Sequence, residues 1–243
     1  MVLLSASEIQ AQTTAYQFKT TDGNFWKMSS LTLSDKVPGK AQVVIRSSQP
    51  QQTFLGWGTC FNELPWDAYN LLSDNDKQLL VKRMFNPHGD LRLQKGRLSA
   101  GANDYAREWY SCDEIDVNET DFEMEHFNID RDLTTIIPSI KLALAENPEI
   151  DFFCSPWSPP TWMKTNKHYA QRKTNTNGCP FNVPPYFNDQ FIDDPRYYKA
   201  YCLYFDKFIN AYKEQGINIT SLAYQNEAYS NTPYPGCSWT AKT

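Results

Sequence analysis

The chain has 243 residues, a formal net charge of -5 and a sequence pI near 5.3. This acidic balance argues against a nucleic-acid partner, because phosphate binding requires a basic surface. The apolar fraction of 41% is typical of a folded protein, and no apolar run approaches the ~18 residues of a membrane-spanning helix.

Cysteine and histidine patterns give no sign of a metal or a cofactor. None of the six cysteines forms a C-x-x-C pair, and the three histidines share no metal-ligand spacing. Cys154 and Cys202 lie in apolar patterns, which predicts buried thiols.

The N-terminal quarter of the chain is interpreted as a leader followed by strands. Residues 1–13 are typical of a signal remnant or a disordered N-terminus, and the first reading predicts a secreted or periplasmic protein. Residues 14–50 predict β-strands, with a hairpin about Asp22-Gly23 and a further strand over 40–48. These strands are too few to form a stable sheet alone, so we expect them to join others.

From residue 54 the pattern changes to alternating strands and helices. A short apolar run predicts a strand over 54–58. Ser73 then caps a helical pattern that continues to about Phe85, with Asp76 at the capping-box position. A second strand is expected within residues 91–101.

The next helix is expected to begin at Asp130 and to end at Asn147-Pro148. Pro138 lies inside this pattern and predicts a kink or a late start, because proline cannot donate a helical hydrogen bond. A third strand is expected within residues 150–156.

The strongest helix signal begins at Asp194-Pro195, a cap followed by proline at the first helical position, and ends at Gly216. Its expected apolar stripe consists of Tyr198, Tyr201, Cys202, Phe205, Phe208, Ile209 and Tyr212. A fourth strand is expected within residues 217–227. Four strands separated by helices predict a parallel sheet, either doubly wound or a (β/α)₈ TIM barrel.

Two observations favour the barrel. The segment GWGTCFNE after the first strand lacks the full G-x-G-x-x-G of a dinucleotide site. Polar residues also gather after each strand end, where barrel active sites are built. They are Asn62 and Glu63, Asn103 and Asp104, Ser155, Trp157 and Ser158, and Asn226 and Glu227. Four strands are counted, so residues 51–243 predict the first half of a barrel.

Glu227 is the strongest catalytic candidate. A carboxylate at a strand end beside an amide is suited to general acid/base work, with a pKa raised by partial burial. Asn226 is suited to binding a sugar hydroxyl. The alternative is a Glu in an ordinary salt bridge.

The segment SPWSPPTWMKTN, residues 155–166, strengthens that hypothesis. Its paired prolines stiffen the loop that presents Trp157 and Trp162, and rigid indoles at a barrel mouth suit the apolar face of a sugar. A packing loop is the alternative. Glu63, Asn103 and Asp113 are further candidates for binding hydroxyls, although each alone is typical of a structural polar residue.

Together, the segments GWGTCFNE, RLSAGANDY, SPWSPPTWMKTN and AYQNEAYSNTPYPGCSWT resemble glycoside hydrolase family 30, the glucosylceramidase-like enzymes, over about residues 54–243. The resemblance implies a (β/α)₈ barrel with a β-sandwich side domain built from both ends of the chain. It implies retaining hydrolysis of β-glycosidic bonds without a cofactor. Glu227 would be the acid/base, Asn226 would bind the 2-hydroxyl, and Trp157 would line the −1 subsite.

The sequence departs from the family pattern at two places. Glu63 stands where the glucosylceramidases commonly have Asp, and Arg97-Leu98-Ser99 keeps only the Arg of Arg-Val-Pro. The sequence therefore does not decide between glucosylceramide, β-1,6-glucan, xylan, β-fucosides and β-galactosides as the substrate. The expected role is in carbohydrate or glycosphingolipid catabolism.

The nucleophile of this family is a second Glu on the seventh barrel strand, and nothing in this chain matches it. The chain is thus expected to be an N-terminal half that is inactive alone, with a β-linked glycoside or oligosaccharide as the substrate of the full enzyme. A non-catalytic carbohydrate-binding module and a gene remnant are the competing hypotheses.

Overall fold

The computed structural model describes residues 15–31, 39, 44, 46, 48–180 and 189–243. The possible leader over 1–13 lies outside the described residues, as does most of the strand expected over 40–48. The chain divides between Phe54 and Leu55 into two compact units. Each unit is described by itself.

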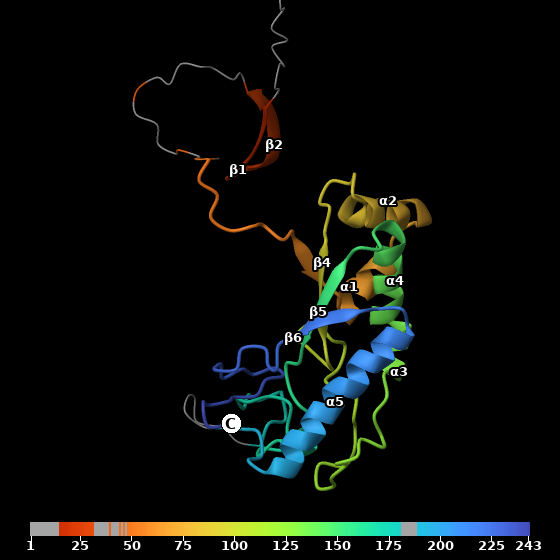
Figure 1. The fold of residues 1–243 in the computed structure, drawn as a ribbon, viewed down its shortest axis with the longest axis vertical. Coiled ribbons are helices and arrows are strands. Elements are labelled where there is room, and N and C mark those ends of the chain that lie inside the picture. The colour runs from red at the N-terminus through yellow and green to blue at the C-terminus, as the bar shows by residue number, and fades with distance from the viewer. Residues whose placement is uncertain (1–14, 32–38, 40–43, 45, 47, 181–188) are drawn as a thin grey trace, which may run out of the picture. The chain divides into compact units, whose positions relative to one another are not determined.

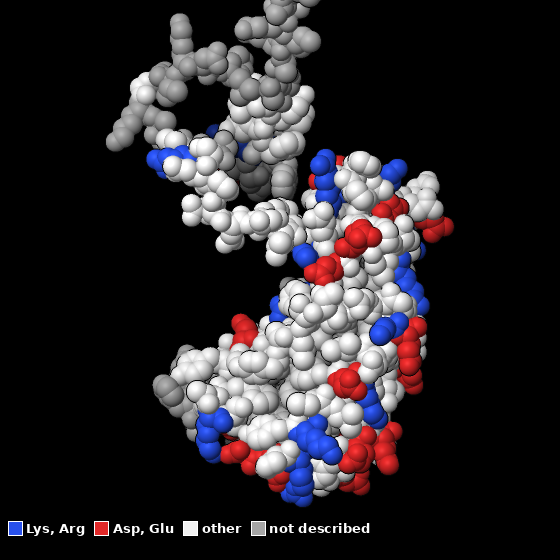
Figure 2. All heavy atoms as spheres, viewed as in Figure 1, with Lys and Arg blue, Asp and Glu red and all other residues white. Residues whose placement is uncertain are grey.

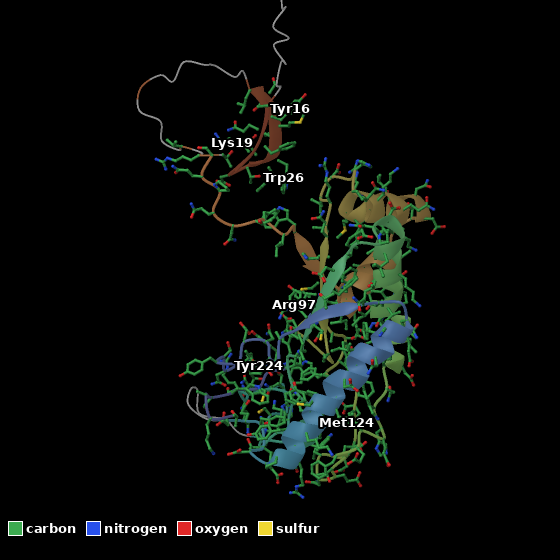
Figure 3. All side chains as sticks on the ribbon, in the orientation of Figure 1. Tyr16, Lys19, Trp26, Arg97, Met124 and Tyr224 are labelled. Carbon is green, nitrogen blue, oxygen red and sulfur yellow. The ribbon has the colours of Figure 1, made fainter. Side chains whose placement is uncertain are left out.

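The first unit contains the predicted hairpin. Strand β1 (Ala15–Thr21) pairs antiparallel with β2 (Asn24–Leu31) around the Asp22-Gly23 turn (Figure 1). Most side chains of the two strands are exposed, including Phe18 and the labelled Tyr16 and Trp26 in Figure 3. Two strands with exposed apolar side chains do not make a stable sheet alone.

The second unit contains a parallel sheet of four strands, as the alternating pattern predicts. The strands are β3 (Gly58–Cys60), β4 (Lys95–Ser99), β5 (Asp151–Ser155) and β6 (Ile219–Leu222), and they pair in chain order. The first strand begins later than the expected 54–58. Gly56 interrupts extended backbone there with a φ of +107°, and ladder pairing starts at Gly58 opposite Lys95.

The helices of this unit are α1 (Glu63–Asn70), α2 (Asp74–Phe85), α3 (Asp130–Thr134), α4 (Ile136–Glu146) and α5 (Pro195–Glu214), with a 3₁₀ turn at η1 (Thr161–Met163). Figure 1 shows α1, α2, α4 and α5 on one side of the strands. Helix α1 was not predicted. Pro65 in its first turn is a position that tolerates proline, but the same residue obscures the helical signal in the sequence.

The predicted helix boundaries are confirmed where a specific residue marks them. The Ser73 side chain accepts from the Asp76 amide, and the Asp194 side chain accepts from the Arg196 amide. Gly216 follows α5 with a φ of +80°. Pro138 has no N–H for the carbonyl four residues earlier, and the helix breaks at Thr135 between α3 and α4.

The core of the second unit lies between the sheet and the helices. Leu98, Phe152 and Cys154 from the strands are buried in one cluster with residues of α4 and α5. The predicted burial of Cys154 is confirmed, but that of Cys202 is wrong because this thiol is exposed. The rest of the predicted α5 stripe is largely confirmed: Tyr201, Phe205, Phe208 and Tyr212 are buried, and Tyr198 and Ile209 pack against the core. Ala200 and Tyr204 are buried with them.

Charged side chains of the second unit gather over the helices in Figure 2, whereas the surface around β5 and β6 is largely uncharged in this view. In the part of the chain that the structure describes, none of the helices combines the length and the apolarity needed to cross a membrane.

Candidate active site

Arg97, on β4, connects three of the segments that are expected at the strand ends. Its Nη2 donates to Asn226 Oδ1 at 2.6 Å. Its Nε and Nη2 donate to Ser155 Oγ at 3.2 and 3.0 Å. Its guanidinium carbon lies 4.3 Å from the centre of the Trp157 ring. A single side chain therefore fixes the ends of β4 and β5 and the segment after β6.

The alternating direction of side chains along β4 explains why Arg97 is available for these contacts. Gly96 and Leu98 are buried, and successive side chains of a strand point to opposite faces. Figure 3 shows Arg97 on the side of the sheet away from the helices. A hollow of about 390 Å³ lies over this face and is lined by Gly58, Thr59, Cys60, Lys95, Gly96, Arg97 and Phe153.

The Asn226-Glu227 pair follows β6 and is held by backbone contacts. The Asn226 amide donates to the Pro156 carbonyl at 2.8 Å, and Gln225 Nε2 donates to the Trp157 carbonyl at 2.6 Å. Glu227 has a φ of +49°, a left-handed conformation that costs free energy for residues other than glycine. Its side chain is exposed, so the partial burial expected from the sequence is not found.

Tyr234 is the partner that the structure gives to Glu227. Its hydroxyl donates to Glu227 Oε2 at 3.2 Å. Burial and then the Glu227 charge raise the pKa of Tyr234, and the Asp104 charge adds to this shift. A lone Tyr seven residues after Glu227 belongs to no motif, so the sequence gives no signal for Tyr234.

The two tryptophans of the 155–166 loop have different environments. Trp157 is mostly buried and lies against Arg97. Trp162 is fully buried, and its Nε1 donates to Asp113 Oδ2 at 2.9 Å. The expected position of Trp162 at the mouth is therefore wrong, because the residue belongs to the core. Burial raises the pKa of its partner Asp113 to about 6.

The remaining predicted sugar-binding residues have internal partners. Both Glu63 carboxylate oxygens accept from Arg131, at 2.7 and 3.0 Å, and Oε2 also accepts from the Arg107 amide. Asn103 Nδ2 donates to Asn62 Oδ1 at 2.6 Å. Glu63, Asn103 and Asp113 are all buried. Sugar binding by these residues stays a prediction.

Lys164 anchors the 155–166 loop to the segment beyond Glu227. Its Nζ is fully buried and donates to the Tyr169 and Gly236 carbonyls at 2.7 and 2.6 Å. Burial lowers the pKa of this ammonium group to about 8. Among the described residues, no three His, Cys, Asp or Glu side chains are grouped as a metal site.

Comparison with known proteins places this geometry in a family context. The model of the glycosyl hydrolase family 30 TIM-barrel domain matches residues 54–235. The Caenorhabditis elegans protein named "Putative glucosylceramidase 1" is 30% identical over 190 residues, which are 78% of this chain and 33% of that protein. An endo-1,6-β-D-glucanase of Aspergillus fumigatus is 28% identical over 78% of this chain and 38% of its own length.

Solved structures share the fold at lower identity. An endo-β-1,6-glucanase superposes with a TM-score of 0.64 and 24% identity over 81% of this chain and 40% of its own. SrfJ from Salmonella typhimurium superposes with a TM-score of 0.68 and 20% identity over 90% and 44%. The chain spans about a third of the curated relatives that it matches. The family match and the partial (β/α) barrel agree, and the chain belongs to glycosyl hydrolase family 30.

Proposed function

We propose that this chain carries the acid/base half of a retaining β-glycosidase site, with Glu227 as the acid/base. The observation that supports this most strongly is the Arg97–Asn226 contact, because it fixes an amide directly beside Glu227 at the carboxyl ends of parallel strands. Barrel enzymes build their active sites at these strand ends.

Asn226 has the geometry of a hydroxyl-binding residue. Because Arg97 donates to its Oδ1, the amide is oriented with Nδ2 as a donor toward a sugar 2-hydroxyl. Hydrogen bonds to the 2-hydroxyl strengthen in the oxocarbenium-like transition state. Trp157, beside the same guanidinium, supplies the wall of the −1 subsite.

Glu227 has two tasks in this mechanism. Its carboxylic acid protonates the glycosidic oxygen as the bond to the sugar breaks, and the resulting carboxylate then removes a proton from the attacking water. Tyr234 donates to Oε2 and so holds the carboxyl group in one orientation. Two relatives are named as a glucosylceramidase and an endo-1,6-β-glucanase, which supports a β-glucoside as the substrate.

The nucleophile is expected on a later strand than those described. Retaining enzymes need a second carboxyl group ~5–5.5 Å from the acid/base. The family resemblance assigns it to the seventh barrel strand, and the described sheet has four strands. We therefore expect the 243-residue chain to bind a β-glucoside without hydrolysing it.

Two measurements on the chain test this function. No release of nitrophenol from 4-nitrophenyl β-D-glucoside is expected, and sustained turnover would contradict the missing nucleophile. Methyl β-D-glucoside is expected to bind in a titration followed by NMR, and Asn226→Ala should weaken it by about tenfold, the effect of one lost hydrogen bond. Asn118→Ala, an exposed site, is the control. Equal binding by both variants would contradict the role of Asn226.

A further inference from the structure

A second hollow, of about 680 Å³, opens in the same unit as the candidate active site. Two loops and one residue beyond Glu227 line it: Arg107, Glu108 and Trp109, then Thr174, Thr176 and Asn177, and Pro233. Neither the predicted catalytic residues nor Arg97 contributes to it. It is therefore separate from the hollow over the sheet.

The position of this hollow connects it to the acid/base. Pro233 directly precedes Tyr234, whose hydroxyl donates to Glu227 Oε2 at 3.2 Å. On the opposite wall, the Arg107 amide donates to Oε2 of Glu63, a predicted sugar-binding residue, at 2.8 Å. Both walls are thus connected to residues of the candidate active site. The acid/base protonates the oxygen of the leaving group. Space next to Tyr234, which orients the acid/base, is therefore expected on the side where the leaving group binds.

The wall formed by residues 174–177 is preformed. Asn177 Nδ2 donates to the Pro233 carbonyl at 3.0 Å and to the Arg172 carbonyl at 2.7 Å. Asn177 Oδ1 accepts from the Thr174 amide at 2.9 Å. This one side chain fixes its own loop and joins it to the segment beyond Glu227, so a ligand would not have to order the wall on binding.

The opposite wall presents an indole. The Trp109 ring meets His168 edge to face, with ring centres 5.8 Å apart, and Trp109 stays partly exposed. The two charged residues that line the hollow are paired, because Arg107 Nε donates to Asp67 Oδ2 at 2.8 Å and Glu108 lies 3.5 Å from Arg131. The hollow therefore offers an aromatic surface and hydroxyl groups without an unpaired charge.

This lining discriminates between two kinds of leaving group. A sugar ring has an apolar face for an indole and hydroxyls for threonine side chains. An alkyl chain needs a continuous aliphatic surface, and Pro233 is the one aliphatic residue among those that line the hollow. We propose that the hollow is a leaving-group subsite that takes a β-linked sugar residue, so that the substrate class is an oligosaccharide and not a glycolipid. The proposal rests on the acid/base role of Glu227.

Binding to the 243-residue chain tests this subsite, because it requires no turnover. Three kinds of ligand are compared: methyl β-D-glucoside, the disaccharides cellobiose and gentiobiose, and octyl β-D-glucoside below its micelle concentration. At least one disaccharide should bind about tenfold more tightly than the methyl glucoside, and octyl glucoside should show no such gain. Trp109→Ala should remove the gain and leave methyl glucoside binding unchanged. Trp26→Ala, an exposed indole of the hairpin, is the matched control.

A second variant tests the subsite independently in case Trp109→Ala misfolds. Thr176 is exposed, so Thr176→Trp is expected to unfold at the same temperature as the parent chain. The new indole should fill the hollow and remove the gain in affinity for the disaccharide. A gain for octyl glucoside alone, or a disaccharide gain that survives both variants, would overturn the subsite while the proposed function stands. Failure of methyl β-D-glucoside to bind would overturn the proposed function and the subsite with it.

Discussion

At the scale of single residues, Arg97 determines the geometry of the candidate site. It contacts Ser155, Asn226 and Trp157, and the first two lie 58 and 129 positions away in the sequence. The sequence marked Arg97 as the one retained residue of a family motif, but it did not show what the guanidinium holds. The exposure of Glu227 and the burial of Trp162 are likewise set by packing between distant segments, which local pattern does not report.

Arg97→Lys is expected to weaken methyl β-D-glucoside binding by about tenfold. An ammonium group lacks the planar fork that lets guanidinium bind Ser155 and Asn226 together while lying on Trp157. Arg83→Lys is the matched control, because Arg83 is exposed and pairs with Asp90 at the surface. Titration by NMR measures both variants. Parent-like affinity in Arg97→Lys would show that Asn226 is held by other contacts.

At the scale of elements, the helices are predictable from local signals and their packing is not. Ser73, Asp194-Pro195 and Gly216 mark helix ends in the sequence and do so in the structure. The contact between α3 and α5 has no such signal. It is made by buried Asp132, which accepts at 2.7 Å from Tyr110 and from Tyr212, a residue 80 positions away.

The Asp132 contact predicts a pH dependence of stability. Burial raises the pKa of Asp132 to about 6, above the ordinary 3.8, so the folded state binds this proton more tightly than the unfolded state. The protonated Asp132 side chain therefore makes its full contribution to the free energy of unfolding below about pH 4. This contribution, about 3 kcal/mol at most, is lost as the pH rises through 6. Asp132→Asn should remove this part of the slope in urea unfolding between pH 4 and 7.5.

Asp130→Asn, an exposed site on the same helix, should keep the parent slope and so serves as the control. An unchanged slope in Asp132→Asn would mean that Asp132 stays ionised in the folded chain over this range.

Gly96 sets the distance between the sheet and its core. A Cβ at this position would lie 2.4 Å from the Phe152 ring and 3.1 Å from the Phe61 ring. Gly96→Ala is therefore expected to lower the free energy of unfolding by about 1–3 kcal/mol, the usual effect of overpacking. Gly216→Ala has open space and only an unfavourable φ of +80°, so about 1 kcal/mol is expected. Urea unfolding compares the two, and equal losses would rule out the steric account.

At the scale of the whole molecule, the chain is a family 30 protein that spans about a third of its curated relatives. The parallel sheet follows from the strand–helix alternation, and the order β3-β4-β5-β6 is the one a barrel requires. In the proposed function, the described strands supply the acid/base side of a retaining site. Under that proposal, hydrolysis requires a further strand that carries the nucleophile.

Azide rescue tests the acid/base role of Glu227 most directly. Joined to the remainder of the Caenorhabditis elegans relative, residues 1–243 are expected to hydrolyse 2,4-dinitrophenyl β-D-glucoside. In that protein, Glu227→Ala should lose about 10²–10⁴-fold in kcat, because water then lacks its general base. Azide should restore turnover and yield β-glucosyl azide, since a small anion needs no base. A variant with the parent rate, or one that azide does not accelerate, would contradict Glu227 as the acid/base.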